Sequence, residues 1–134
     1  MSAAANKQLA CDFLERLNAS DAAGALAMMT DDVTWWIAGK PDLLPVAGTY
    51  NKQQATQLLH NLVSQLPNGI KMTVKSMMAE DDRVALEVEG TGALRNGRVY
   101  DQQYHFLLTM RDGKISAIKE YLDTQHVYAV WIQQ

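Results

Sequence analysis

Cysteine is nearly absent from this chain of 134 residues, and its scarcity excludes two kinds of site. The single cysteine, Cys11, has no partner for an internal disulfide and no companion at the spacing of a metal site. It falls within a segment that reads as a helix, where we expect a buried structural thiol. The three histidines, His60, His105 and His126, show no His-x-x-x-His spacing. We therefore expect no bound metal.

Long apolar runs and an excess of charge of one sign are also missing. No apolar run approaches the ~20 residues that a membrane-spanning helix needs, and Met1–Lys7 lacks the basic start and apolar run of a signal peptide. The net charge of −3 gives no reason to expect nucleic acid or an anionic membrane as a partner. No phosphate-binding loop, nucleotide fingerprint or nucleophile motif is present. These absences favour a cytoplasmic protein that works without a cofactor.

The chain does contain a clear change of hydrophobic period. Apolar residues make up 48% and charged residues 20%, which fits one globular domain spanning residues 1–134. Apolar positions recur every three or four residues in three early segments and alternate from Ile70 onward. This pattern predicts helices over residues 4–18, 22–29 and 52–66, and strands over residues 33–37, 70–78, 83–94, 104–110 and 115–121. The sequence therefore predicts an α+β fold, with three helices against antiparallel strands.

The last third of the chain carries the strongest local signal. Asp112-Gly113 separates two apolar runs, a pattern typical of a hairpin because glycine accepts the positive φ that the turn requires. The second run ends in Glu120, Tyr121 and Asp123, so its polar content rises where a core strand would stay apolar. A strongly bent sheet wrapped over three helices encloses a cone, and we expect its cavity to begin at this polar end.

Four short motifs, in this order, resemble one superfamily. They are Asp31–Trp35, Pro45–Tyr50, Asp112–Ile115 and Glu120–Thr124. Together they resemble the nuclear-transport-factor-2-like superfamily, in particular its SnoaL-like and ketosteroid-isomerase-like branch. The resemblance implies a cone-shaped α+β barrel with a pocket, in which three N-terminal helices pack on a strongly curved antiparallel sheet. It also implies a homodimer formed through the outer face of the sheet.

The resemblance does not extend to the residues of a ketosteroid isomerase. The carboxylate base of those enzymes corresponds to Ile37 and their tyrosine donor to Phe13, and neither side chain can transfer a proton. Their donor aspartate corresponds to Phe106 or, with a shorter turn, to His105. The Asp-Arg-Asp group of the epoxide-hydrolase branch also finds no convincing place in the sequence. We therefore do not expect steroid isomerisation by the usual mechanism.

The SnoaL-type polyketide cyclases offer a better match. Their acid/base aspartate corresponds to Glu120, five residues after Ile115. Glu120 is then either a pocket acid/base whose pKa is raised by desolvation, or an exposed glutamate paired with a neighbouring cation. His105 is either a proton shuttle for Glu120 or a residue of the dimer interface. Asp123 is either a second pocket acid or the residue that terminates the strand.

Substrate contacts are expected from the side chains that share the pocket face. This set is Phe13, Trp36, Tyr50, Leu59, Val63, Tyr104, Phe106, Ile118 and Leu122. Alternation puts Trp35 and Trp36 on opposite faces of their strand and leaves open which of them lines the cone. It leaves the choice between His105 and Phe106 open as well. The hydroxyls of tyrosines 50, 100 and 104 either donate to a bound carbonyl or simply reach solvent.

Two functions stay open on the sequence. The first is a small cofactor-independent enzyme with isomerase-like or cyclase-like acid–base chemistry on a hydrophobic cyclic carbonyl compound. The second is a non-catalytic small-molecule-binding or accessory dimerisation domain, which the apolar residues at Ile37 and Phe13 favour. Both functions require a hydrophobic small-molecule ligand or a partner copy of the chain, and neither requires nucleic acid or a membrane.

Overall fold

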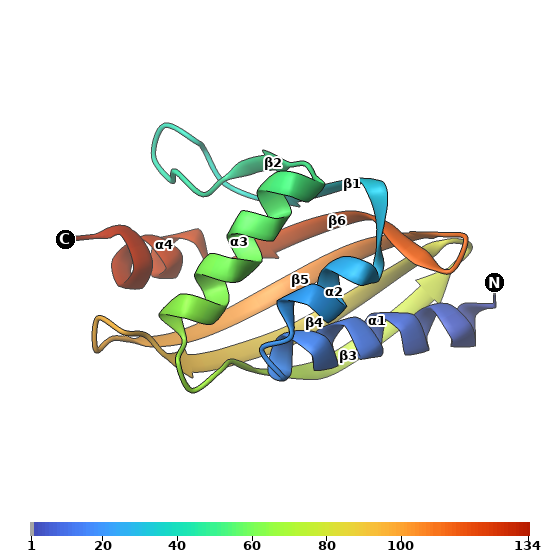
Figure 1. The fold of residues 1–134 in the computed structure, drawn as a ribbon, viewed down its shortest axis with the longest axis horizontal. Helices are drawn as coiled ribbons and strands as arrows, with labels where there is room; N and C mark the ends of the chain where they lie inside the picture. Colours follow the sequence, from blue (N-terminus) through green and yellow to red (C-terminus); the bar gives the residue numbers. More distant parts are fainter. Residues whose placement is uncertain (1) are drawn as a thin grey trace.

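The computed structural model describes residues 2–134, and its centre is a six-stranded sheet in the order β2-β1-β6-β5-β4-β3. The strands are β1 (Met29–Ile37), β2 (Gly48–Tyr50), β3 (Lys71–Glu80), β4 (Arg83–Ala93), β5 (Val99–Arg111) and β6 (Lys114–Leu122). The helices are α1 (Ala3–Asn18), α2 (Ala22–Ala27), α3 (Lys52–Gln65) and α4 (Thr124–Val127), followed by a π-helical turn, η1 (Tyr128–Ile132). Figure 1 shows α4 at the end of the sheet opposite the N-terminus.

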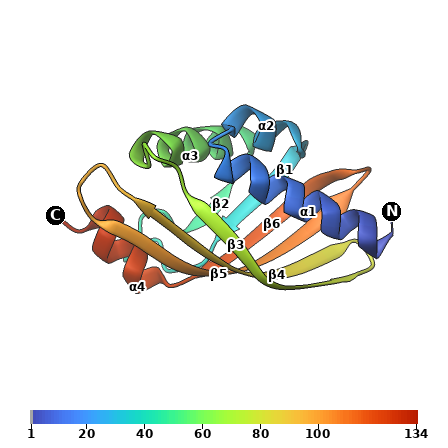
Figure 2. The same ribbon diagram turned by 90° about the horizontal axis from the view of Figure 1, so that it is seen from below.

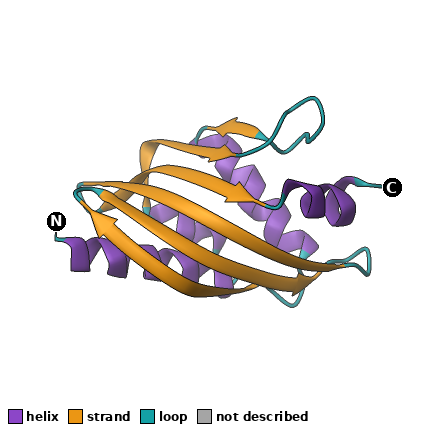
Figure 3. Cartoon of the chain, turned by 180° about the vertical axis from the view of Figure 1, so that it is seen from behind, coloured by secondary structure: helices purple, strands orange, loops and turns teal. Residues whose placement is uncertain are grey.

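The sheet curves around the three longer helices. Figure 2 shows the strands bending beneath α1, α2 and α3, which all lie on one side of the sheet. Figure 3 shows the other side, which no helix of residues 2–134 covers. The expected α+β cone is therefore confirmed. Among residues 2–134, no helix is both long enough and apolar enough to cross a membrane.

One strand pair departs from the expected antiparallel sheet. β1 runs parallel to β6, with Trp35 opposite Ile118, whereas the other neighbouring strands are antiparallel. A hairpin imposes an antiparallel pair, but β1 and β6 are joined through most of the chain, so no tight turn sets their direction. The expectation is wrong at this pair for that reason.

Short-range hydrogen bonds and turn geometry fix the starts of α2 and α3 and the last turn. Asp21 caps α2 by accepting a hydrogen bond from Gly24 N at 2.8 Å. Asn51 caps α3 and forms a reciprocal capping box with Gln54. In the β5–β6 turn, Asp112 has φ of 52° and Gly113 has φ of 77°, the pair of positive values that this kind of hairpin turn needs. Each feature depends on neighbours within four residues, which is why the sequence predicts it.

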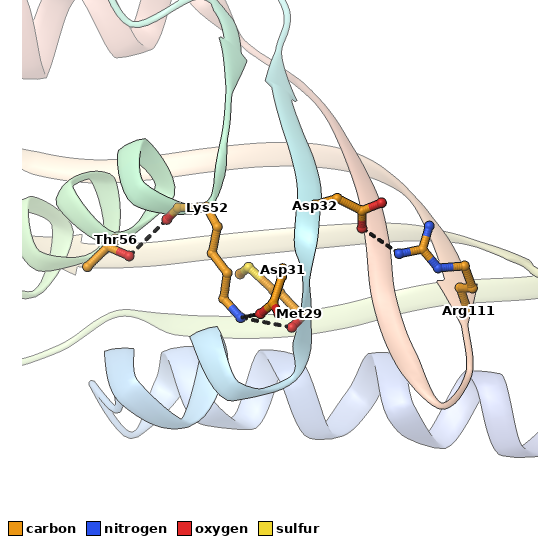
Figure 4. A network of polar contacts seen from close by, with 6 residues as sticks. All are labelled: Met29, Asp31, Asp32, Lys52, Thr56 and Arg111. Atoms are coloured by element: carbon orange, nitrogen blue, oxygen red, sulfur yellow. Dashed lines mark hydrogen bonds and ion pairs between the residues drawn. The ribbon is translucent and has the colours of Figure 1, made fainter.

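Strand β1 begins earlier than expected. The acidic residues Asp31 and Asp32 lie inside β1 rather than in a break before it. Figure 4 shows how their carboxylates are held: the Lys52 ammonium pairs with Asp31 at 3.5 Å and donates to the Met29 carbonyl at 3.0 Å, and Arg111 pairs with Asp32. These ion pairs are largely exposed, so each contributes little stability. Their visible consequence is to connect β1 to α3 and to the β5–β6 hairpin.

Part of the buried core lies at the end of the cone near the β5–β6 turn. Phe13, Met29, Leu108, Ile115 and Ile118 are each no more than 1% exposed. They come from α1, β1 and the inner faces of β5 and β6. Alternation turns every second side chain of β5 toward the helices, and a register shift between Ile115 and Ala117 lets both Ile115 and Ile118 of β6 face inward. Toward the other end of the same strands, this apolar filling gives way to a cavity.

Candidate functional site

A cavity of about 100 Å³ lies between α3, the inner face of the sheet and the C-terminal segment. Its wall is mostly apolar, with Leu58, Leu59 and Leu62 contributed by α3. The polar side chains on the wall are Glu120, Asn61 and the two tyrosines Tyr100 and Tyr104, together with the indoles of Trp35 and Trp131. An apolar cavity with a few converging polar groups is the usual form of a small-molecule site.

Glu120 is the only charged residue on this wall among residues 2–134. It lies on β6 opposite Ile37 of β1 and Phe106 of β5, and it is 8% exposed. The indole Nε1 of Trp35 donates a hydrogen bond of 2.9 Å to Glu120 Oε1. No other side chain or backbone group of the described residues hydrogen-bonds to the carboxyl group, so Oε2 has no protein donor. That oxygen is available to a molecule in the cavity.

Burial changes the acidity of Glu120. Removal from water disfavours the carboxylate and raises the pKa from 4.5 to about 7, while the Trp35 hydrogen bond opposes part of this increase. At neutral pH the group therefore exists in comparable amounts as acid and as carboxylate. A group in that state can both give and take a proton without a large free-energy penalty in either direction.

Two tyrosines form a hydrogen-bonded pair beside this carboxyl group. The hydroxyl oxygens of Tyr100 and Tyr104 are 2.7 Å apart, and either can be the donor. Burial, with a further contribution from the Glu120 charge, raises the pKa of both hydroxyls, so both stay protonated. One hydroxyl proton forms the hydrogen bond between the two tyrosines, so the other hydroxyl proton can be donated to a ligand oxygen. Gly90 makes room for this pair, since a Cβ there would lie 3.0 Å from Tyr104 Cε2.

Asp123 does not face the cavity, and its predicted role as a second pocket acid is wrong. Its carboxylate accepts a hydrogen bond from His126 N at 3.0 Å and so caps α4. Its backbone is clamped by the buried Gln102, whose Nε2 donates to Asp123 O at 3.0 Å and whose Oε1 accepts from Asp123 N at 2.7 Å. The alternative interpretation, a residue that ends the strand, is the one that the structure bears out.

His105 and Trp36 lie on the outer face of the sheet, so neither is placed to contact a ligand in the cavity. His105 is exposed and pairs across the sheet with Tyr121, while Phe106 takes the inward position. Trp36 packs edge-on against Tyr121, with 5.1 Å between ring centroids. The expectation of Trp36 as a pocket residue is wrong because Val33, Trp35 and Ile37 form the buried alternation of β1.

The other predicted ligand contacts divide into two groups. Leu59, Tyr104, Phe106 and Leu122 line the cavity, whereas Phe13, Tyr50, Val63 and Ile118 do not. Phe13 and Ile118 belong to the dense core, and Phe13 packs edge-on behind Trp35 at 6.1 Å between centroids. Tyr50 turns its hydroxyl to the Val46 carbonyl at 2.7 Å.

The cavity wall includes residues that the sequence left open or did not indicate, among them Trp35, Val127 and Trp131. The choice of Trp35 over Trp36 was detectable, because Trp35 shares its face with Val33 and Ile37 rather than with Asp32 and Thr34. Val127 and Trp131 were not, because α4 and η1 are too short to show a helical period. The structure also places no group of three or more metal-ligating side chains together anywhere within residues 2–134.

The comparison with protein families agrees with this fold and cavity. The model of the SnoaL-like domain matches residues 11–118. The chain belongs to the SnoaL-like domain family. The match ends two residues before Glu120, so family membership alone assigns no role to that side chain.

Individual relatives of this SnoaL-like chain are distant. It is 28% identical over 97 residues to UPF0523 protein B of Dictyostelium discoideum. That match covers 70% of this chain but only 60% of the Dictyostelium protein. A structure of an NTF2-like protein from Burkholderia xenovorans LB400 is 27% identical, with a TM-score of 0.74 over 96% of this chain and 97% of its own. An LEH-like epoxide hydrolase of M. tuberculosis has a TM-score of 0.77 at 15% identity, covering 95% and 89%, a likeness of fold alone.

Proposed function

We propose that this SnoaL-like chain is a small enzyme that moves a proton on a hydrophobic cyclic carbonyl compound, with Glu120 as the general acid/base. The observation that carries the proposal is the position of Glu120: a carboxyl group with a pKa of about 7 on the wall of an apolar cavity, with one oxygen that accepts no hydrogen bond from the described residues. A structural glutamate on the surface would have neither property. The proposal agrees with the coarser inference that the fold family includes enzymes.

The cavity supports a simple sequence of proton transfers. The Glu120 carboxylate takes a proton from the carbon next to the substrate carbonyl, which breaks a C–H bond and leaves an enolate. The free hydroxyl proton of the Tyr100–Tyr104 pair donates to the enolate oxygen as negative charge develops there. Glu120, now a carboxylic acid, returns the proton to the same or another carbon. Trp35 orients the carboxyl group throughout.

Two other functions have less support. An epoxide hydrolase of the Asp-Arg-Asp kind is disfavoured because no aspartate or arginine of residues 2–134 lines the cavity. A passive binding domain is consistent with the apolar side chains at Phe13 and Ile37, but it leaves the buried carboxyl group without a purpose. An ionised carboxylate in an apolar wall lowers the stability of the fold. A pocket that only binds apolar ligands would therefore be more stable with an apolar residue in place of Glu120.

The deciding experiment follows deuterium exchange at the carbon next to the carbonyl, by NMR in D₂O with a panel of cyclic ketones. Glu120→Gln is expected to lower the exchange rate by about 10²- to 10⁴-fold, the usual contribution of a general base. Glu87→Gln, an exposed glutamate on β4, is the matched control and is expected to exchange at the wild-type rate. Exchange that persists unchanged in Glu120→Gln would refute the assignment, and binding without any exchange would favour the passive domain.

We also propose that the chain forms a homodimer through the outer face of the sheet. No described helix covers this face, and it carries the half-exposed aromatic cluster of Trp36 and Tyr121 beside His105 and Lys119. Large aromatic side chains are enriched at the centres of protein interfaces. Sedimentation analysis should give a dimer for the wild type and a monomer for Tyr121→Glu. A wild-type monomer at micromolar concentration would contradict this proposal.

A further inference from the structure

The C-terminal segment, residues 124–132, forms the part of the cavity wall that the proposed chemistry does not use. Val127 of α4 and Trp131 of η1 both line the cavity. The Trp131 ring packs edge-on against Tyr100, with 5.5 Å between centroids, and Tyr100 is one half of the hydroxyl pair. Figure 1 shows this segment at the end of the sheet away from the N-terminus. Trp131 therefore stands where a larger ligand would extend.

Polar contacts hold this segment in place. Arg98 Nη1, beside the β4–β5 turn, donates to Ala129 O at 2.9 Å and to Gln133 O at 2.7 Å, and Asn96 Nδ2 donates to Val130 O at 2.9 Å. Carbonyls at the end of a helical segment lack partners within the helix, and a cation there is electrostatically favourable. His126 adds a further contact by accepting from Asp101 N at 2.9 Å. The backbone that carries the Trp131 ring is thus held to the β4–β5 turn and to β5 by hydrogen bonds.

The size of the cavity limits what can enter while Trp131 keeps this position. Its volume of about 100 Å³ is below the roughly 300–1,000 Å³ of typical ligand sites and closer to the ~150 Å³ engineered cavity that binds benzene. A four-ring molecule is larger than this space and would have to extend past its wall, where Trp131 lies. The wall carries no lysine, arginine or histidine among residues 2–134, so nothing there compensates an anionic ligand.

We propose that Trp131 sets the upper size limit of the site and that its ligand is an uncharged single-ring compound with one carbonyl or hydroxyl oxygen. The polar part of this proposal rests on the proposed function, because the oxygen is the atom that the Tyr100–Tyr104 pair would bind. The size limit rests on the cavity alone. Trp131 is thus a specificity-determining residue, which excludes larger ring systems, while Glu120 carries out the proton transfers.

The test is a series of binding measurements with cyclohexanone, decalone and a four-ring steroid ketone. Binding is followed through the indole N–H signals of the tryptophans in NMR titrations, where Trp35 reports the cavity and Trp36 on the outer face is an internal control. Wild type is expected to bind cyclohexanone at least about tenfold more tightly than decalone. Trp131→Ala is expected to reverse that order. Ile132→Ala, in the same segment but not on the cavity wall, is expected to keep it.

Several results would overturn the proposal. The size limit is wrong if wild type binds one-ring and four-ring ketones equally tightly, or if Trp131→Ala keeps the wild-type order of affinities. The uncharged ligand is wrong if cyclohexylammonium binds more tightly than cyclohexanone. The site itself is wrong if no ring compound changes the Trp35 signal. If Trp131→Ala does not fold, Trp131→Phe and the wild-type series decide the question. The two proposals can fail separately. If the affinities follow ligand size as expected but Glu120→Gln exchanges deuterium into the ketone at the wild-type rate, the size limit is supported and only the proposed function is refuted.

Discussion

The inner face of β5 and β6 has two halves that follow the same alternation and do different things. Near the turn, Leu108 faces Ile118 across the two strands, and both are 1% exposed. Toward the other end, Phe106 faces Glu120 and Tyr104 faces Leu122, and these four side chains line the cavity. The pairing is regular from Leu108 and Ile118 to the far end of the strands, so the difference lies in the side chains and in what packs on them. In the cavity half, α3 and the C-terminal segment contribute the rest of the wall.

This contrast separates stability from function along one pair of strands. In the core half, every side chain has apolar neighbours, so its contribution is measured by the area and volume that it fills. In the cavity half, a carboxyl group and two hydroxyls are kept away from water with few partners, which lowers stability and creates reactivity. Substitutions in the two halves should therefore differ both in their effect on unfolding and in their dependence on pH.

The largest expected effect on stability is in the core half. Leu108→Ala should lower the free energy of unfolding by about 4 kcal/mol, because a fully buried leucine leaves a cavity that its neighbours cannot fill. Leu122→Ala should cost only about 1 kcal/mol, since Leu122 is half-buried beside space that already exists. Urea denaturation of the two variants measures both values. Equal losses would mean that the two halves are packed alike.

The next effect is the dependence of stability on pH. Native Glu120 holds its proton up to about pH 7, whereas the unfolded chain releases it near the ordinary value of 4.5. Stability therefore falls as pH rises through this range, by about 3 kcal/mol between about pH 4 and pH 8.

Glu120→Gln should lack that contribution, and the difference in unfolding free energy between the two proteins isolates it from other titrating groups. Thermal or urea unfolding across this pH range provides the measurement. Parallel pH profiles for wild type and variant would contradict the raised pKa.

The smallest expected effect comes from the one hydrogen bond that the carboxyl group accepts. Trp35→Phe removes the indole donor and so disfavours the carboxylate, which should raise the pKa of Glu120 by about one unit. Trp36→Phe, the neighbouring residue on the outer face, should leave that pKa unchanged. The pH midpoint of ketone exchange in each variant provides the comparison. A shift of the same size in both variants would show that the indole of Trp35 has no specific role.

Features that depend on a few neighbouring residues could be predicted from the sequence. The caps at Asp21 and Asn51, the Asp112-Gly113 turn and the place of Glu120 near a cavity all follow from local spacing or from the resemblance to SnoaL-like proteins. The predicted start of β1, at residue 33, was wrong because two consecutive aspartates, Asp31 and Asp32, are typical of a turn. In the structure they belong to the strand, where Lys52 of α3 and Arg111 of the β5–β6 hairpin pair with their carboxylates.

Features that depend on contacts between distant segments could not be predicted. The parallel pairing of β1 with β6 and the closing of the cavity by Trp131 join residues far apart in the chain. The volume of the cavity depends on how Trp131 packs on Tyr100, which in turn depends on Arg98 holding a backbone more than thirty residues away. No local pattern in the sequence encodes such a contact.

The most direct measurement is the pKa of Glu120 itself. The side-chain carboxyl ¹³C signals of the glutamates can be followed by NMR across the pH range, and the signal missing from Glu120→Gln identifies the one that matters. We expect a pKa of about 7 for that signal. A pKa at or below the ordinary value of 4.5 would show that the carboxyl group is well solvated, and it would remove the acid/base role on which the proposed function depends.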